Sequence, residues 1–225
     1  MRELDVFDIL GPVMIGPSSS HTAGAVRLGN VAAMIYNRRP KKVDFYLHGS
    51  FAKTYKGHGT DLALVAGILG YAPDDERIRD AFDHAKAQNI AIYFHEADLG
   101  YVHPNTVKII FEDDKERFQV IGSSLGGGTI KIIDINGAEV ALHADYPTLV
   151  LQYPDKLGII NRVSSIMATA GVNIASMKVT RRQKKATMIL ELDGKIDQTT
   201  YNFLASSIEL DYLTSVGAVE ENHGV

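Results

Sequence analysis

The spacing of hydrophobic residues changes repeatedly between residues 148 and 220, and this change limits the fold more than any other feature of the sequence. Hydrophobic side chains recur at every second position in a half-buried strand and at every third or fourth position in an amphipathic helix. A strand-like run at 148–153 comes first, and Gly171 ends the helix that follows it. The apolar face of this helix is formed by Ile159, Val163, Ile166, Met167 and Ala170. The segment therefore begins with a strand and an amphipathic helix.

The rest of this segment continues the alternation. Strands are expected at 173–180 and 186–192, joined by the basic turn RRQKK at 181–185. A helix at 197–209 and a strand at 216–220 follow. The order βαββαβ predicts a ferredoxin-like arrangement.

Residues 1–145 are organised differently, because most of their helices precede most of their strands. Apolar spacing predicts helices at 20–39, from an N-cap at Thr60 or Asp61 to Gly70, and around 77–88. The predicted strands are 43–47, 90–95, 106–112, 117–123 and 129–136. The sequences DDKE and Asn-Gly between the later strands are typical of hairpin turns. Because helices and strands are segregated, we expect an α+β domain with a largely antiparallel sheet.

A short polar connection at 141–146 separates the two patterns. We therefore expect two domains, an α+β domain at 1–145 and a ferredoxin-like βαββαβ domain at 146–225.

Cysteine is absent from all 225 residues, so this chain alone can form no disulfide, cysteine nucleophile or thiolate-held metal site. A net charge of −4 gives no reason to expect nucleic acid or an anionic membrane as a partner. The N-terminal run MRELDVFDIL carries acidic residues, unlike a signal peptide, and no stretch is apolar enough to span a membrane. A cytoplasmic location is expected.

The sequence GPSSSHTAGAVRLG places small polar side chains directly before a predicted helix. The first turn of a helix has unpaired amides and partial positive charge, so hydroxyls and amides there can hold a phosphate or a carboxylate. The hydroxyls would come from Ser18, Ser19, Ser20 and Thr22. In the alternative interpretation one serine caps the helix and the others lie in a loop. The adjacent His21 favours the anion site, because an imidazole is of little use as a cap.

A second polar cluster, HGSFAKTYKGHGTD at 48–61, lies between a predicted strand end and a helix start. Functional sites often form at such strand ends. Glycines flank His58, which would let it approach a ligand, whereas His48 has an equally good structural interpretation. The glycine-rich run GSSLGGGTIKI at 122–132 either lets the backbone approach a ligand closely or forms a flexible bulge. No Walker motif is present, and we expect no strand-to-helix nucleophile elbow of the kind that serine hydrolases use.

The sequences GPVMIGPSSSHTAGAVRLG, HGSFAKTYKGHGTD and GSSLGGGTI resemble the β chain of the iron–sulfur-dependent L-serine dehydratases (L-serine ammonia-lyases). This resemblance covers nearly all of residues 1–145. Residues 147–225 are similar to an ACT domain, including PDKLG before the first helix and GVNIASM after it. The order of the two parts matches the β chain of the two-chain form of the dehydratase.

The resemblance implies that L-serine is deaminated to pyruvate and ammonia. In this family a 4Fe-4S cluster with one open iron acts as a Lewis acid for the departing hydroxyl. Because this chain has no cysteine, it supplies no metal ligand, and a cysteine-bearing α subunit is the expected partner. A monovalent cation is a further candidate cofactor.

The resemblance also implies roles for the polar clusters. The substrate carboxylate is expected at Ser18, Ser19, Ser20 and Thr22, while His21 and His58 are the catalytic candidates, either as general base or as proton relay. A second set of substrate-binding candidates consists of His48, Ser50 and Thr60.

ACT relatives bind amino acids at the loop between the first strand and the first helix, and L-serine is the expected effector here. The corresponding residues are Asp155, Lys156, Leu157, Gly158 and Asn161, with Asn173 and Ile174 nearby. Alternatively, this domain only mediates homodimerisation or docking.

Two other functions remain open at this point. Residues 1–145 also resemble the serine-binding accessory domain of some phosphoglycerate dehydrogenases, which implies a non-catalytic serine- or anion-binding regulatory protein. The anion-site argument alone also fits an unrelated phosphate-binding enzyme. The pair of His21 and His58 favours catalysis, because a simple anion clamp does not need it.

Overall fold

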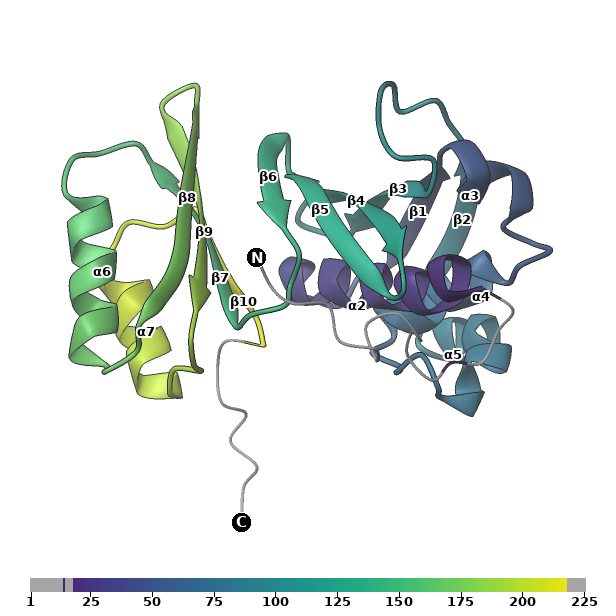
Figure 1. Ribbon diagram of the computed structural model, residues 1–225, viewed down its shortest axis with the longest axis horizontal. Coiled ribbons are helices and arrows are strands. Elements are labelled where there is room, and N and C mark those ends of the chain that lie inside the picture. The colour runs from purple at the N-terminus through teal and green to yellow at the C-terminus, as the bar shows by residue number, and fades with distance from the viewer. Residues whose placement is uncertain (1–13, 15–17, 218–225) are drawn as a thin grey trace, which may run out of the picture. The chain divides into compact units, whose positions relative to one another are not determined.

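Strand β1 (Lys42–Leu47) lies inside a sheet because its hydrophobic residues alternate with polar ones. Val43, Phe45 and Leu47 are fully buried on one face. The computed structural model describes Met14 and residues 18–217, and Figure 1 shows their course. Contacts divide the chain into two units between Gly137 and Ala138.

A six-stranded sheet has the order β2-β1-β3-β4-β5-β6. The strands beside β1 are β2 (Ala91–Glu96), β3 (Thr106–Glu112), β4 (Arg117–Gly126), β5 (Thr129–Ile135) and β6 (Ala138–Leu142). β1 and β2 are parallel, whereas β1–β3, β3–β4 and β4–β5 are antiparallel pairs. The α+β class and the largely antiparallel sheet predicted from the sequence are confirmed.

The helices of the first unit follow one another along the chain as η1 (Ser19–Ala23, a π-helical turn), α2 (Gly24–Tyr36), α3 (Gly49–Thr54), α4 (Thr60–Ile68), η2 (Glu76–Asp80, a 3₁₀ turn) and α5 (Ala81–Ala87). Helix α2 packs on β4 and β5, α5 packs on β2, and α4 contacts both of these helices. Figure 1 shows α2 running along the sheet. The short helix α3 follows the end of β1 and contacts β3.

Helices α2 and α4 approach each other closely at two glycines. A Cβ atom on Gly67 would lie 2.2 Å from the carbonyl oxygen of Val26, and one on Gly29 would lie 2.6 Å from that of Leu64. Both distances are far below a van der Waals contact, so only glycine fits at either position. The same packing brings α4 into contact with η1, which precedes α2.

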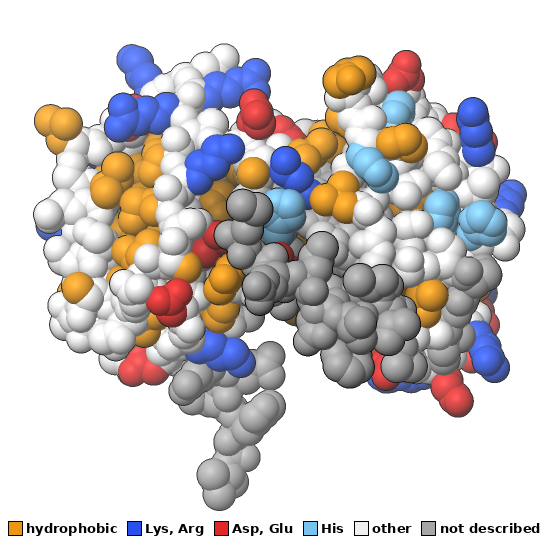
Figure 2. All heavy atoms as spheres, in the orientation of Figure 1, with side chains coloured by type: hydrophobic (Ala, Val, Ile, Leu, Met, Phe, Trp, Pro, Cys, Tyr) orange, Lys and Arg blue, Asp and Glu red, His pale blue; other side chains and the backbone are white. Residues whose placement is uncertain are grey.

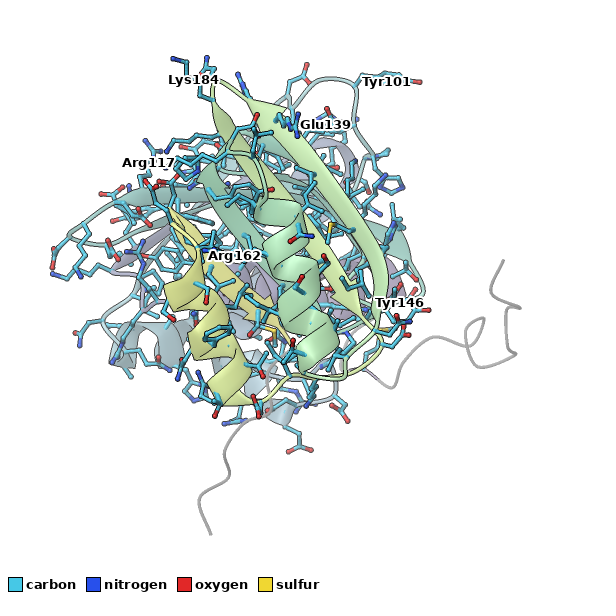
Figure 3. All side chains as sticks on the ribbon, turned by 90° about the vertical axis from the view of Figure 1, so that its left-hand side faces the viewer. Tyr101, Arg117, Glu139, Tyr146, Arg162 and Lys184 are labelled. Carbon is cyan, nitrogen blue, oxygen red and sulfur yellow. The ribbon has the colours of Figure 1, made fainter. Side chains whose placement is uncertain are left out.

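The second unit begins with β6, and the elements after β6 have the order βαββαβ with a sheet of order β10-β7-β9-β8. Its elements are β7 (Thr148–Pro154), α6 (Ile159–Thr169), β8 (Ile174–Arg182), β9 (Lys185–Leu192), α7 (Gln198–Ser207) and β10 (Tyr212–Val216). Leu149, Leu190 and Leu204 belong to its buried core. The guanidinium group of Arg162 on α6 reaches α7 and donates a hydrogen bond to the carbonyl of Ser207 at 2.6 Å (Figure 3).

The turn predicted at 181–185 is shorter in the structure, because β8 extends to Arg182 and β9 begins at Lys185. The turn consists of Gln183 and Lys184, both with positive φ, and all residues from 181 to 185 are exposed. Figure 2 shows Lys and Arg side chains gathered over this turn, and Figure 3 shows Lys184 pointing away from the strands.

Several sequence expectations about local structure are wrong. The first helix ends at Tyr36, because Asn37 adopts a left-handed conformation with φ 52°. The N-cap of α4 is Gly59 and not Thr60 or Asp61. Helix α3 forms within the polar cluster at 48–61, where no helix is expected from the sequence.

Two strands also differ from the sequence expectation. β6 occupies part of the connection expected to be polar, and its Leu142 is fully buried. β10 lies at Tyr212–Val216 and not at 216–220, of which residues 218–220 lie outside the described part of the chain. The buried Thr214 interrupts the hydrophobic alternation of this strand and so conceals it. The assignment of 1–145 and 146–225 as functional domains stays a prediction.

None of the helices in the described part of the chain is long and apolar enough to cross a membrane.

The close contact of α2 and α4 leads to a stability prediction for Gly67→Ala. We expect the unfolding free energy of this variant to be lower by about 1–3 kcal/mol, because the new methyl group overlaps the backbone of Val26. Urea unfolding followed by circular dichroism measures this loss. The matched control is Gly57→Ala, where the nearest atom lies 3.8 Å from the added Cβ. Equal stability of the two variants would contradict the importance of the helix contact.

Candidate functional site

The polar sequence at 18–22 forms the start of the first helix. Ser18 is the N-cap, with extended backbone, and its hydroxyl accepts a hydrogen bond from the amide of His21 at 3.4 Å. The five residues of η1 form a π-helical turn, which ends where the amide of Gly24 donates to the carbonyl of Ser19. Short π-helical turns are often found at functional sites. The predicted helix start is therefore confirmed, but its first turn is wider than that of an α-helix.

The imidazole of His21 is surrounded by hydroxyl groups. Its Nδ1 lies 3.1 Å from the hydroxyl of Ser20 and 3.3 Å from that of Ser18. Its Nε2 lies 3.3 Å from the hydroxyl of Ser50 on α3. Only 7% of His21 is exposed. Both ring nitrogens can exchange hydrogen bonds with groups that donate as well as accept.

His58 lies next to His21, although 37 residues separate them in the sequence. Their ring centroids are 4.9 Å apart and the rings are nearly perpendicular, at 89°. The backbone amide of His58 donates to the carbonyl of Thr54 at 3.0 Å, which fixes the turn after α3. Gly59, with φ 67°, then allows the chain to enter α4. Nδ1 of His58 is buried and has no hydrogen-bond partner among the described residues.

Burial lowers the pKa of His21 from its ordinary value of 6.5, and the neighbouring His58 lowers this pKa further. His21 is therefore neutral near pH 7 and able to accept a proton. Phe51, whose ring centroid lies 5.3 Å from that of His21, covers it on another side. This combination of a neutral imidazole, hydroxyls and a second imidazole suits proton transfer.

The structure brings some of the other predicted residues into the cluster, but not all of them. Ser18, Ser19, Ser20 and Ser50 are partly exposed, whereas Thr22 and Thr60 are buried, at 2% and 0% exposure. The hydroxyls of both threonines are buried without a partner among the described residues. A ligand can therefore reach the serine hydroxyls more readily than those of the threonines.

His48 has a different environment from the other two histidines. It is the N-cap of α3, and its Nδ1 accepts a hydrogen bond from the amide of Leu99 at 3.2 Å. This contact ties α3 to the loop between β2 and β3, from which Tyr101 projects (Figure 3). The geometry favours the structural interpretation of His48.

Sequence reasoning missed two residues of this site, Phe51 and Ser124. The hydroxyl of Ser124, on β4, donates to the carbonyl of Ser20 at 2.9 Å. In the run GSSLGGG the last three glycines, which end β4 and form the turn after it, all have positive φ. The contact of this run with η1 comes from Ser124.

The residues predicted to bind an effector lie in the second unit, at the start of α6. Asp155, Lys156, Leu157, Gly158 and Asn161 all line a pocket of about 670 Å³. Neither Asn173 nor Ile174 is among the described residues that line it. The side-chain amide of Asn173 donates instead to the carboxylate of Asp193 at 2.8 Å.

Further side chains line this pocket as well. Among them are Tyr153 and Arg181, and Nε of Arg181 lies 3.4 Å from the carboxylate of Asp155. The pocket thus contains charges of both signs, as a zwitterionic ligand requires.

Comparison with known proteins gives consistent matches. A family model described as "Serine dehydratase beta chain" matches residues 5–90. The chain is 45% identical to the L-serine dehydratase beta chain of Peptoniphilus asaccharolyticus, over 92% of this chain and 94% of that protein. It is 42% identical to the probable L-serine dehydratase beta chain of Bacillus subtilis, over 96% of this chain and 99% of that protein. It is also 27% identical to D-3-phosphoglycerate dehydrogenase of Methanocaldococcus jannaschii, over 77% of this chain but only 33% of that protein.

The environment of His21 leads to a prediction about its titration. We expect the pKa of His21 to lie below 6.5, because the ring is buried. In His58→Gln this pKa should rise, because the repulsion by the second imidazole is removed while the burial remains. NMR titration of histidine-labelled protein measures both values, with His21→Gln identifying the signal. The unfolded chain takes up this proton at a higher pH, so stability decreases as the pH falls from about 6.5 towards the folded pKa.

The control for this titration is His84→Gln, because the His84 ring contacts Tyr71 on another part of the unit. It should leave the pKa of His21 unchanged. A wild-type pKa at or above 6.5 would show that the imidazole is not buried in solution.

Proposed function

The chain belongs to the family of L-serine dehydratase beta chains, and on this premise we propose that it is the β subunit of an enzyme that deaminates L-serine to pyruvate and ammonia. The observation that supports this role most directly is the contact between His21 and His58 beside the serines of η1. An anion clamp without chemistry has no use for two imidazoles 4.9 Å apart.

The first turn of the helix is the proposed carboxylate site. The hydroxyls of Ser18, Ser19 and Ser20 and the amides of this turn are donors at the positive end of a helix dipole. Thr22 would contribute only through packing, because its hydroxyl is buried. Bound in this way, the substrate would present its α-carbon towards the histidine pair.

Proton removal is the proposed task of this pair. A neutral imidazole of His21 or His58 would take the α-proton, and the electron pair of the broken C–H bond would form a double bond as the β-hydroxyl leaves. The protonated imidazole then gives its proton to the departing hydroxyl, so the products are aminoacrylate and water. Tautomerisation of aminoacrylate to the imine and hydrolysis of the imine give pyruvate and ammonia. Ser50, which contacts Nε2 of His21, would carry the proton to or from the ring.

This chain does not fit an iron–sulfur cluster on its own. It has no cysteine, and the described residues contain no group of three metal-binding side chains. We therefore propose that an α chain with cysteines is the partner and holds the 4Fe-4S cluster. A cytoplasmic location is part of this proposal, because the thiolates that hold such a cluster are kept reduced there.

The proposed role of His58 predicts the activity of a variant. In the enzyme reconstituted with its α chain, we expect His58→Ala to lower kcat about 10²- to 10⁴-fold, because a positioned acid or base is lost. An anaerobic pyruvate assay measures this change, and the iron content shows whether the cluster is intact. His84→Ala is the matched control. Wild-type turnover of His58→Ala with an intact cluster would remove His58 from the chemistry and leave His21 as the base.

For the second unit we propose an ACT domain at 146–225 that binds L-serine as an effector. The pocket at the start of α6 supports this, because it offers Asp155 and Arg181 as opposite charges beside Gly158, whose φ of 84° opens the first turn of α6 to a ligand. A homodimer through this domain is the second part of the proposal, since β8 and β10 are edge strands that can pair with another copy.

The effector proposal predicts a difference between two asparagine variants. Calorimetric titration of the full chain with L-serine should lose one binding event in Asn161→Ala, which removes a pocket side chain. Asn173→Ala should keep it, because Asn173 bonds to Asp193 and does not line the pocket. Identical heats for wild type and both variants would leave association as the role of this domain.

A further inference from the structure

We propose that Ser124 is a positioning residue, which holds the π-helical turn η1 so that His21 faces the reacting substrate. This inference rests on the proposed function, because it assigns to β4 a part in the same site. Ser124 is fully buried and does not touch the imidazoles. Its effect on the chemistry would therefore pass through the backbone of Ser20.

Ser124 makes one hydrogen bond to η1 through its hydroxyl and another to its own sheet region through its backbone amide. The hydroxyl of Ser124 donates to the carbonyl of Ser20 at 2.9 Å. The amide of Ser124 donates in turn to the carbonyl of Asn105 at 2.9 Å, which fixes the strand end that carries the hydroxyl. A distant strand thus supplies a hydrogen-bond donor to the residue directly before His21.

Gly24 makes room for this hydroxyl. A Cβ atom on Gly24 would lie 2.0 Å from Oγ of Ser124 and 2.9 Å from its Cβ. Gly24 is also the residue whose amide closes the π-helical turn on the carbonyl of Ser19. The glycine and the serine are therefore complementary in shape, and together they fix both ends of the turn.

The neighbouring Ser123 offers a matched comparison. It is buried to a similar degree, at 3% exposure, and its hydroxyl also makes a hydrogen bond, 2.7 Å from the hydroxyl of Thr106. This bond lies between β3 and β4 and does not involve η1. Loss of either serine hydroxyl removes one buried hydrogen bond from β4, but only Ser124 acts on the turn of His21.

The first experiment compares Ser124→Ala with Ser123→Ala in the full chain. We expect Ser124→Ala to move the pKa of His21 towards 6.5, because a loosened turn exposes the ring. Ser123→Ala should leave the pKa of His21 unchanged. In the enzyme with its α chain, Ser124→Ala should lower kcat about 10- to 100-fold, since misplacement of a catalytic group by about 1 Å has an effect of this size. KM should change less than kcat.

A second experiment separates the hydrogen bond from simple packing. Gly24→Ala should disturb the turn by overlap with Ser124, and the double variant Gly24→Ala/Ser124→Gly should restore folding by removing the overlapping side chain. Because the donor is still missing, the double variant should keep the low kcat of Ser124→Ala. Full recovery of kcat in the double variant would reduce Ser124 to a packing role and overturn the inference.

The titration also separates this inference from the proposed function. If the wild-type chain with its α partner fails to deaminate L-serine, the proposed function is wrong, but the pKa of His21 in the two serine variants still tests the link from Ser124 to the turn. Equal pKa values in Ser124→Ala and Ser123→Ala would overturn that link.

Discussion

The arrangement of the site depends on the contact between α2 and α4, which only glycine permits. Gly29 and Gly67 leave no space for a Cβ atom between the two helices. Because η1 leads into α2 and His58 lies just before α4, the distance between the helices also sets the distance between the two imidazoles. Larger side chains at positions 29 and 67 would push α2 and α4 apart, and this would move His58 away from His21. The close packing at the two glycines therefore also fixes the distance between the two histidine rings.

Most strands and the ferredoxin-like element order could be predicted from the sequence, because they depend on local spacing. The pairing of the two polar clusters was implied only by the resemblance to a known family. The π-helical turn, α3 and the capping of α4 by Gly59 could not be predicted, because they depend on tertiary contacts and on backbone conformation. Ser124 was missed for the same reason. Its partner, the carbonyl of Ser20, is 104 residues away, and no sequence pattern identifies a backbone acceptor at that distance.

The surroundings of His21 differ from those of histidines that are oriented by a carboxylate. Three serine hydroxyls lie within 3.3 Å of its ring nitrogens, and each can donate or accept. Such a ring can change the nitrogen that carries its proton without losing hydrogen bonds. A proton relay needs this property. Among the described residues no carboxylate is hydrogen-bonded to this ring, and its pKa is lowered by burial and by His58.

The separation of Ser124 from Ser20 has a consequence for the order of events in folding. A nascent chain exposes both histidines and both helices long before β4 leaves the ribosome, and the carbonyl of Ser20 then still lacks its donor. Closing a loop of this length is entropically costly and happens only when the sheet has assembled. The histidine cluster is therefore among the last parts of this unit to acquire its full set of hydrogen bonds, and its geometry depends on the complete sheet.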